Sequence, residues 1–533
     1  IGGPLVPSAA IALEKVSPVL LMKMAASIAG TYVAPVGIGA ARGADSATLT
    51  LVLTPPFRAT SVDLVFTSAA TWDGGTVTVT GTDTAGNSQT ESVNQAAIQA
   101  LGAGARTYRG KKVFATISSI AKGAQGTDTG TVTAVFGTKT TAISGSDSVF
   151  SVTGTPTNRW QVQARLEKDG DVSNAAALPA FSYTLDDGNN WTGPIAMPVG
   201  GVYSLPSGLQ TGLTLNFLGA ACKAGDVFRV ETVAPASNTQ DLSDALAAAN
   251  ASQFDFECIH IVGPTDAVSA AVISTYITAA ENQSSPKPYF VVIEPRDQAP
   301  DGTESEATWI NVISGASPGF QNFADYRISA MAGFGEILDP LSGRIERRSL
   351  AAPYVARLME IPVGTDPGEV ALGPVTGIVS LYHDEAAREA LDSQRFATFR
   401  TFGRLPGFYV TLGRMLYPIG SDFQKIQYLR VINKCMRLVY DALLIYVNAK
   451  IKVDAKTGKI LEKQARAIEL PIVTLLKTIL GDNITEPRVR VDRTRNMIVE
   501  SKLSAKVGIV PVGYAEVVEF GIGLINPAIE QVI

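Results

Sequence analysis

Short alternating runs of hydrophobic and polar residues fill the first half of the chain. Between residues 48 and 140, "LTLVLTPP", "SVDLVFTS" and "GTVTVTGTDTAGNSQTESV" follow the period of a β-strand, and the polar residues 83–87 predict a turn. From residue 146 to 235, runs such as "RWQVQARLEKDG" and "GLTLNFLG" continue this pattern between turns rich in Gly and Asn. We therefore expect two consecutive β-rich modules, the first with polar faces that suit a surface position.

The pattern changes after residue 237, where helical and strand-like runs begin to alternate. "TQDLSDALAAANAS" and "DAVSAAVISTYITAAENQ" predict helices, whereas "FECIHIVGP" and "PYFVVIEP" predict short buried strands. We expect "ATWINVIS" to continue the series as a strand and "FQNFADYRISAMAG" as a helix. Alternation of this kind predicts a parallel sheet with helical crossovers.

Two helices followed by strands are expected towards the C-terminus. The first begins at Ser421, which fits a capping box with Gln424. Its apolar residues recur at helical spacing and predict one buried stripe: Phe423, Ile426, Leu429, Ile432, Cys435, Val439, Ala442 and Tyr446. Four cations fall largely off this stripe, namely Lys425, Arg430, Lys434 and Arg437. A second helix is predicted over residues 465–480, and "RVRVDR" and "KVGIVPVGYAEVVEF" predict strands.

The chain closes on "YAEVVEFGIGLINPAIEQVI", residues 514–533, which is apolar and rich in strand formers. A terminal segment is usually polar and loose unless something ties it down. No further run follows with which this segment could form a hairpin. The tail therefore raises the question of which strand it pairs with.

Composition and charge place the chain among multidomain globular proteins. It has 533 residues, 46% hydrophobic and 17% charged, with a net charge of −5. Residues 393–510 contain 21 Lys and Arg against 9 Asp and Glu, a balance of +12, so the rest of the chain carries −17. The basic third suggests either an anionic partner or a solvated mixture of charges. Its cations are spread over helices and strands without interleaved aromatics, so nucleic acid is not an expected partner.

Membrane insertion and metal binding find little support in the residue pattern. Residues 18–41 are apolar and about as long as a bilayer span, but Lys23 and Pro35 interrupt them, so we expect this segment to pack against protein. The three cysteines are far apart and form no CxxC pair, which predicts buried reduced thiols: Cys222, Cys258 and Cys435. Of the two histidines, His260 lies in an apolar strand and is interpreted as structural. No cofactor or metal is expected.

One catalytic motif is present, although its context is incomplete. "GASPG", residues 315–319, is a GxSxG centred on Ser317, with an expected strand before it and a helix-like run after it. Asp339 and His383 follow in the order of an α/β-hydrolase triad, and His383 is expected at a helix N-terminus. However, Pro318 has no backbone N–H to contribute to an oxyanion hole. We therefore interpret Ser317 as a loop residue and do not expect an enzyme.

The C-terminal half of the chain resembles a known family, the contractile tail sheath proteins of myophages and related injection systems. The resemblance lies in "DSQRFATFRTFGRLPGFYVTLGRML", in "KIQYLRVINKCMRLVYDALLIYVNAKI" and in the helix and strands that follow. "SYTLDDGNNWTGP" and residues 240–335 are similar to segments of the divergent branch of phage sheaths. The resemblance covers roughly residues 146–533, and residues 48–140 look like an inserted decoration.

The resemblance implies a structural subunit without catalytic residues. In sheaths, N- and C-terminal arms donate strands to neighbouring subunits, which is a form of β-augmentation. In this chain one arm would be about residues 4–19, and the other would contain the C-terminal donors Val517, Val518, Phe520, Ile522, Leu524 and Ile525.

The resemblance also implies partners and a place of action. Six subunits would form a ring, rings would stack around a tail tube, and a baseplate trigger would let the stack contract, with energy from better-buried interfaces. Candidates for tube contact are Lys425, Arg430, Lys434 and Arg437. The implied partners are other copies of the chain and the tail tube, baseplate and tail terminator proteins. The implied location is the virion tail, assembled in the host cytoplasm, without membrane insertion.

Together these patterns predict a mixed α+β multidomain fold with an α/β sheath core built from both ends of the chain. The expected segments are an N-terminal arm and start of the core (1–47), an inserted all-β module (48–140), a β-rich domain (141–236), an α/β domain (237–392), a C-terminal core domain (393–513) and a strand-donating arm (514–533). The alternatives are a receptor- or glycan-binding virion surface protein and, more remotely, a serine hydrolase built on Ser317.

Overall fold

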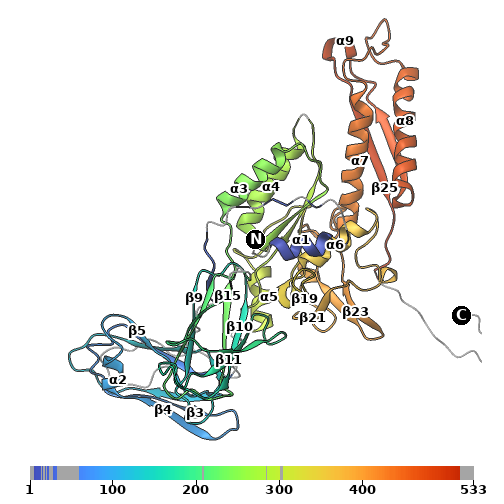
Figure 1. Ribbon diagram of the computed structural model, residues 1–533. Helices are drawn as coiled ribbons and strands as arrows, with labels where there is room; N and C mark the ends of the chain where they lie inside the picture. The colour runs from blue at the N-terminus through green and yellow to red at the C-terminus, as the bar shows by residue number, and fades with distance from the viewer. Residues whose placement is uncertain are drawn as a thin grey trace, which may run out of the picture. The chain divides into compact units, whose positions relative to one another are not determined.

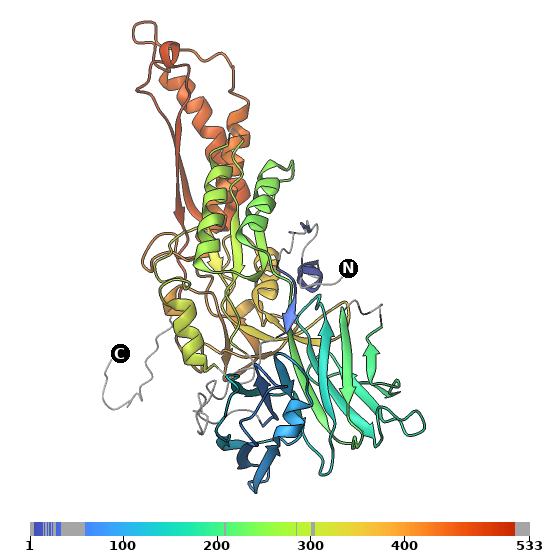
Figure 2. The same ribbon diagram turned by 90° about the vertical axis from the view of Figure 1, so that its left-hand side faces the viewer.

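The protein is seen here as a computed structural model of the 533-residue chain (Figures 1 and 2). The structure describes residues 5–13, 15, 19, 21–22, 24, 28–32, 59–206, 209, 211–283, 285–299 and 304–516. The fold is mixed α/β with several small sheets, as expected from the sequence. Two compact units are present: unit 1 is Ile1–Glu360 with Val370–Gln424, and unit 2 is Ile361–Glu369 with Lys425–Ile533.

The first part of unit 1 consists of two three-stranded antiparallel sheets, with orders β5-β2-β7 and β4-β3-β6. Their elements are β2 (Val62–Phe66), β3 (Val77–Thr82), β4 (Ser88–Val93), α2 (Gln95–Gln99), β5 (Arg106–Tyr108), β6 (Thr116–Ala121) and β7 (Val132–Phe136). In β3, Val77 and Val79 are buried and alternate with half-buried threonines, which is the period predicted from the sequence. Phe66 and Trp72 pack edge to face in the shared core, with ring centroids 5.0 Å apart.

The next part of unit 1 is a pair of sheets around an aromatic core. One has the order β1-β15-β10-β11-β12 with β8 also paired to β15, and the other has the order β13-β14-β9. The strands are β1 (Thr31–Tyr32), β8 (Lys139–Thr141), β9 (Val149–Gly154), β10 (Gln161–Lys168), β11 (Ala180–Thr184), β12 (Thr192–Ala196), β13 (Val202–Ser204), β14 (Leu213–Leu218) and β15 (Val227–Val233). Phe150, Phe181 and Phe217 are buried between the two sheets, so alternate residues of both sheets form one core.

A parallel sheet follows, as the alternating pattern predicts. β16 (Cys258–Pro264), β17 (Phe290–Glu294) and β18 (Ile328–Ala330) pair in this order, with Val291 beside Ile259 and Ile328. The helices are α3 (Thr239–Ala251), α4 (Ala267–Glu281) and α5 (Glu306–Ser314). α3 begins with a capping box between Asn238 and Asp241, so polar side chains satisfy its first amides.

Two predicted elements in this region are wrong. Residues 307–314, "ATWINVIS", form helix α5 and not a strand, because Ser305 caps the helix and Trp309, Ile310 and Ile313 bury one helical face. The run expected to be helical after residue 319 contains turns and then the buried strand β18. The sequence of α5 is rich in β-branched residues, which favour strands, and for this reason it resembled a strand.

The remaining elements of unit 1 include a further antiparallel sheet, β20-β19-β21. They are β19 (Phe334–Leu338), β20 (Ile345–Ser349), α6 (Ala351–Glu360), β21 (Ile378–Leu381), β22 (Phe399–Phe402) and β23 (Leu405–Val410), with 3-10 turns at Val370–Leu372 and Asp392–Gln394. Residues 5–13, expected within an extended arm, form instead the helix α1 (Leu5–Leu13), which packs on α6. Its buried residues Ala9, Ala10 and Ile11 explain this, since alanine favours helix.

Unit 2 contains two long helices and a hairpin. α7 (Ile426–Leu444) and α8 (Glu462–Leu480) are followed by the 3-10 turn Gly481–Asn483, β24 (Ile484–Val491), the short α9 (Met497–Glu500) and β25 (Ala505–Pro511). The expected capping box is not formed: α7 starts after Lys425 without a side-chain cap, and Ser421 Oγ accepts from the N–H of Phe423. The second helix and the strand at "RVRVDR" agree with the predicted pattern. The strand expected over residues 506–520 ends at Pro511, because residues 512–516 are not in a strand, and residues 517–520 lie outside the described residues.

Several single-residue predictions can be compared with the described structure. Cys222 and Cys435 are buried free thiols, whereas Cys258 is only half-buried. His260 Nε2 lies 2.8 Å from Glu294 Oε1, which confirms its structural role. In the part of the chain that the structure describes, no helix is long and apolar enough to cross a membrane, and no cluster of metal-binding side chains is found. Most of residues 18–41 lies outside the described residues.

Candidate assembly interface

The hairpin of unit 2 is a two-stranded sheet that rests on a helical pair. β24 and β25 pair antiparallel, and Val489 lies opposite Val507 on the face that packs against the core of α7 and α8 (Figure 1). Among the described residues, neither strand pairs with a third one. The outer edge of β25 therefore presents backbone N–H and C=O groups to which a further strand can bind. On β24 the N–H of Val491 already donates to Glu469 at 2.7 Å, and Pro487 has no N–H to offer.

The residues that follow β25 are held at the start of α7, in a set of contacts that we call the tail root. The Tyr514 hydroxyl donates to the carbonyl of Gly364, and its ring centroid lies 5.5 Å from that of Tyr428. Lys425 forms an ion pair with Glu516, and its Nζ lies 5.4 Å from the Tyr514 ring centroid. Burial raises the pKa of Tyr514 to about 12, so its phenol remains a donor at neutral pH. The tail root therefore holds residues 514–516 against the start of α7 and Gly364.

The four cations suggested for tube contact do not share one exposed face. Lys425 and Arg430 are only 5% and 2% exposed, so these two are buried although they lie off the apolar stripe. Lys425 belongs to the tail root, and Arg430 Nη2 donates to the carbonyl of Ile361 at 3.4 Å. Helix α7 therefore buries a second face, which packs against residues 361–369. The apolar stripe predicted from the sequence does not reveal this second face. Lys434 and Arg437 are half-buried.

The six predicted strand donors lie outside the described residues. They are Val517, Val518, Phe520, Ile522, Leu524 and Ile525. Strand donation by this segment therefore stays a prediction. The tail-root residues Tyr428, Tyr514 and Glu516 were not singled out from the sequence, and nothing local distinguishes them, because their contacts join segments that are distant along the chain.

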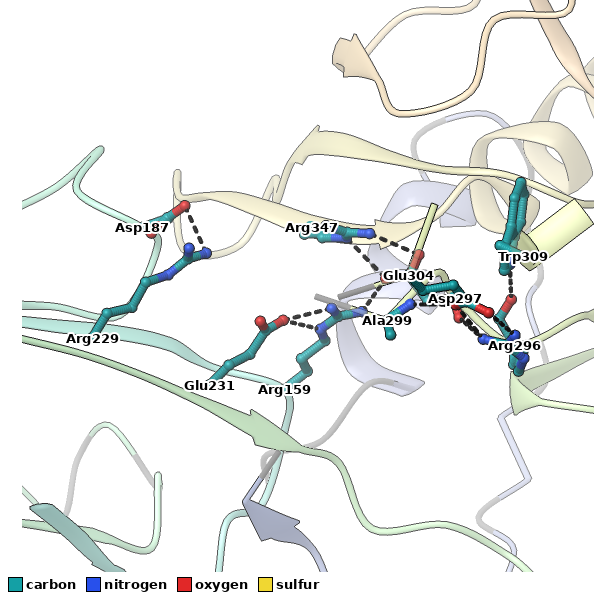
Figure 3. A network of polar contacts seen from close by, with 10 residues as sticks. All are labelled: Arg159, Asp187, Arg229, Glu231, Arg296, Asp297, Ala299, Glu304, Trp309 and Arg347. Atoms are coloured by element: carbon teal, nitrogen blue, oxygen red, sulfur yellow. Dashed lines mark hydrogen bonds and ion pairs between the residues drawn. The ribbon is translucent and has the colours of Figure 1, made fainter. Parts of the chain in front are cut away.

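An ionic network in unit 1 joins the β-sandwich to the end of the parallel sheet (Figure 3). Arg159 Nε donates to Glu231 on β15 at 2.9 Å, and Arg159 also pairs with Asp297, which follows β17. Arg347 on β20 binds both oxygens of the same Asp297, at 2.8 and 3.0 Å. Close by, Arg296 is held by Glu304, with Nη1 and Oε2 2.9 Å apart.

The geometry of this network suits a fixed connection between its elements. Glu231, Asp297 and Arg347 are 3%, 13% and 9% exposed at their side chains, so water competes little for these pairs. Charge-assisted, bidentate contacts are the strongest of the common hydrogen bonds and hold a fixed orientation. Asp297 thus connects two arginines that come from different sheets of unit 1.

The three residues of the hydrolase hypothesis are not brought together. Ser317 is exposed on a loop after α5, so the strand–turn–helix arrangement of a nucleophile elbow is absent there. Asp339 accepts from Ser342 Oγ at 2.6 Å, and His383 lies in a loop and not at a helix start. Both ring nitrogens of His383 are engaged, Nδ1 with Glu306 at 2.6 Å and Nε2 with Glu385 at 2.8 Å. The GxSxG match is therefore a loop without its triad.

The buried His383 predicts a pH dependence of stability. Burial lowers the pKa of His383, but the hydrogen bonds that the ring donates to Glu385 and Glu306 outweigh burial and raise this pKa above its ordinary 6.5. The other charged groups near His383 are Asp384 and Arg388. Arg388 forms an ion pair with Glu306. Because the raised pKa belongs to the folded state, the stabilisation is fully present below pH 6.5 and is lost as the pH rises through the folded pKa.

We expect the thermal unfolding temperature of unit 1 to decrease as the pH is raised from about 6 to about 8. The substitution His383→Gln should make this decrease with pH smaller. Differential scanning calorimetry at both pH values checks this. An unchanged slope in the variant would contradict a charged His383.

Comparisons with known proteins give a family and several structural similarities. Residues 80–414 match the family model described as DUF2586, N-terminal domain, and residues 422–528 match DUF2586, C-terminal domain. No curated protein matches the sequence.

Three solved structures illustrate the structural similarities. The PVC sheath complex of an extracellular contractile injection system, in its contracted state, aligns with a TM-score of 0.40 at 13% identity, over 56% of this chain and 76% of that chain. The contracted helical sheath of the anti-feeding prophage aligns with a TM-score of 0.39 at 14% identity, over 57% and 78%. A sheath tail protein from Desulfitobacterium hafniense aligns with a TM-score of 0.34 at 12% identity, over 70% and 82%. These neighbours are sheath proteins, the class that the sequence resembles.

The two family matches divide the chain between residues 414 and 422, close to the boundary between units 1 and 2 at Gln424. The first match alone spans more than half of the chain. The chain belongs to the DUF2586 family.

Proposed function

We propose that this chain is the structural subunit of a contractile tail sheath. The observation that carries the proposal is the open-edged hairpin β24–β25 in unit 2. A lone two-stranded sheet is marginally stable, and its free edges are templates for pairing with another chain. The chain resembles sheath proteins in sequence over this same region, and it ends on a segment with the composition of a strand.

Polymerisation follows from strand donation between copies. Residues 517–525 of one subunit would add to the hairpin of a neighbour, so that backbone hydrogen bonds supply affinity and the apolar side chains supply register. The tail root supports this arrangement, because it anchors the arm to α7 immediately before the donor residues. Subunits would then stay linked while the lattice changes shape.

Exposed apolar side chains at one end of unit 2 also favour an assembly protein. Ile445 and Val447 follow α7 and are 73% and 65% exposed, and Ile498 and Val499 in α9 are 70% and 78% exposed. The end of α7 and α9 lie at the same end of unit 2 (Figures 1 and 2). Large exposed apolar residues that gather in one region mark interaction surfaces.

The complete proposal is a stack of hexameric rings around a tail tube, which contracts to drive the tube through a host envelope. Contraction would draw its energy from interfaces that bury more apolar surface, with no cofactor or nucleotide. Lys434 and Arg437 remain the candidates for tube contact. The other partners would be baseplate and tail terminator proteins, and the location would be the virion tail after assembly in the host cytoplasm.

Electron microscopy of the purified chain tests this function. Self-assembly into striated hollow tubes or stacked rings is expected, because the donor strand and the acceptor hairpin are on the same chain. A surface protein that binds a receptor or a glycan would remain a small particle.

A further inference from the structure

The outer face of the β24–β25 hairpin carries cations that face each other. Arg490 and Lys506 are directly opposite across the two strands, and both are exposed. Like charges in this position destabilise a sheet. Arg488, two residues before Arg490 on the same face, is paired with Glu486 at 3.0 Å. Within the described part of unit 2, Arg490 and Lys506 have no carboxylate within ion-pair distance.

The neighbouring groups on α8 do not relieve this excess of positive charge. A shallow depression is lined by the outer face of the hairpin together with Glu462, Arg466, Glu469 and Arg493. Arg493 binds both of these carboxylates, with Nη1 2.8 Å from Glu469 and Nε also paired with Glu462. Arg466 also pairs with Glu462 at 2.7 Å, so two arginines already balance these two acids. An anion that matches Arg490 and Lys506 therefore has to come from elsewhere than these described groups.

The tail of the chain supplies one acidic residue with suitable spacing. In residues 517–525, the apolar residues Val518, Phe520, Ile522 and Leu524 alternate with a second set, and Glu519 is the one acid. The second set is Val517, Glu519, Gly521, Gly523 and Ile525. If this segment adds to a hairpin edge, alternation places the apolar set on the inner face, towards the helices. Glu519 then falls on the outer face, where the cations lie.

We propose that Glu519 of a second copy of this chain binds Arg490 and Lys506 and thereby fixes the register of the donated strand. This inference rests on the proposed sheath function and adds to it the residue that selects the register. A slip by one residue turns the apolar set outward and is excluded by hydrophobic burial. A slip by two residues keeps that set inward but moves Glu519 by about 7 Å along the strand, so the charge contact excludes it.

We assign the donor to a second copy because the tail root holds the residues that would have to turn back towards the chain's own hairpin. To return along β25, the chain would need a tight turn within residues 512–516. Those residues are instead bound to Tyr428, Gly364 and Lys425. The contact is thus between molecules, and it depends on protein concentration.

A charge exchange in the full-length chain tests the register contact. Glu519→Lys places three cations together and is expected to raise the concentration required for assembly about tenfold or more. Arg490→Glu with Lys506→Glu is expected to do the same. Combining all three substitutions restores opposite charges and should return assembly to near the original concentration. Glu530→Lys, beyond the donor segment, is the matched control and should have no effect. Sedimentation velocity over a concentration series measures each variant, and circular dichroism confirms that each is folded.

The outcomes separate this inference from the function on which it rests. If Glu519→Lys assembles as the original chain does, while a chain truncated at Phe520 does not, the register contact is wrong and strand donation stands. If neither change affects assembly, both are wrong. Failure of the triple variant to recover, although it is folded, also overturns the contact. If the triple variant does not fold, the double variant Glu519→Lys with Arg490→Glu is tested in its place. The proposal then requires that this double variant assembles at a lower concentration than Glu519→Lys alone.

Discussion

A chain that ends at Phe520 is expected to stay folded and to lose the ability to polymerise. The deletion removes Ile522, Leu524 and Ile525, three of the six proposed donor residues. Each apolar side chain that becomes fully buried contributes about 1.5 to 3 kcal/mol, and about 1.4 kcal/mol corresponds to a tenfold change in affinity. The concentration required for assembly should therefore rise by at least about a hundredfold.

Folding should be unaffected, because the described residues of unit 2 already form a continuous core. Its buried members run from Val363 to Val491, and its partly buried members end at Ile509. Sedimentation velocity measures assembly, and hydrogen exchange in β24 and β25 reports folding. A chain that ends at Ile525 keeps all six donors and is the matched control, which should assemble normally. If both truncated chains assemble equally well, strand donation by this tail is wrong.

Replacement of Asp226 by Asn should strongly destabilise the sandwich of unit 1. Lys139 and Asp226 form an ion pair at 2.9 Å, and their side chains are 1% and 0% exposed. Asp226 also accepts from Ser146, Ser148 and the N–H of Ile143. Asn leaves the ammonium of Lys139 buried without a counter-charge, and breaking a buried pair in this way costs about 3 kcal/mol or more. Amide exchange in β10 and β15 should accelerate by about a hundredfold.

A second variant separates the loss of charge balance from the loss of packing. Lys139→Met with Asp226→Asn removes both charges and keeps similar volumes, and such apolar replacements of buried pairs are often close to neutral. We expect the double variant to recover at least half of the lost protection. Wild-type exchange rates in Asp226→Asn would show that the pair does not stabilise the sandwich. A double variant that is worse than the single one would place the cost in packing.

Elements with a strong and consistent pattern could be predicted from the sequence. The strands of the β modules, the helix–strand alternation around β16 and β17, and helix α8 follow directly from hydrophobic periodicity. α5 could not be predicted in this way, because its β-branched residues at helical spacing compete with the strand pattern. α1 could not either, since its burial depends on α6, which lies far along the chain.

The candidate interface was less predictable than the fold. The apolar stripe of α7 could be seen in the sequence. A second face of α7 is buried against residues 361–369, which the sequence pattern does not reveal. For this reason Lys425 and Arg430 were expected to be exposed, whereas the structure buries them. The tail root and the Asp297 network consist of contacts between distant segments, and no local spacing reveals them. The hairpin edges followed from the strand pattern, whereas their lack of a third strand required the structure.

The measurement that tests the central claim most directly is negative-stain electron microscopy of the purified full-length chain over a range of concentrations. If the chain is a sheath subunit, hollow tubes of constant diameter with regular striations, or stacks of rings, should form without any other protein. Discrete small particles at every concentration, with no rings or tubes, would contradict the proposal that this chain builds a sheath.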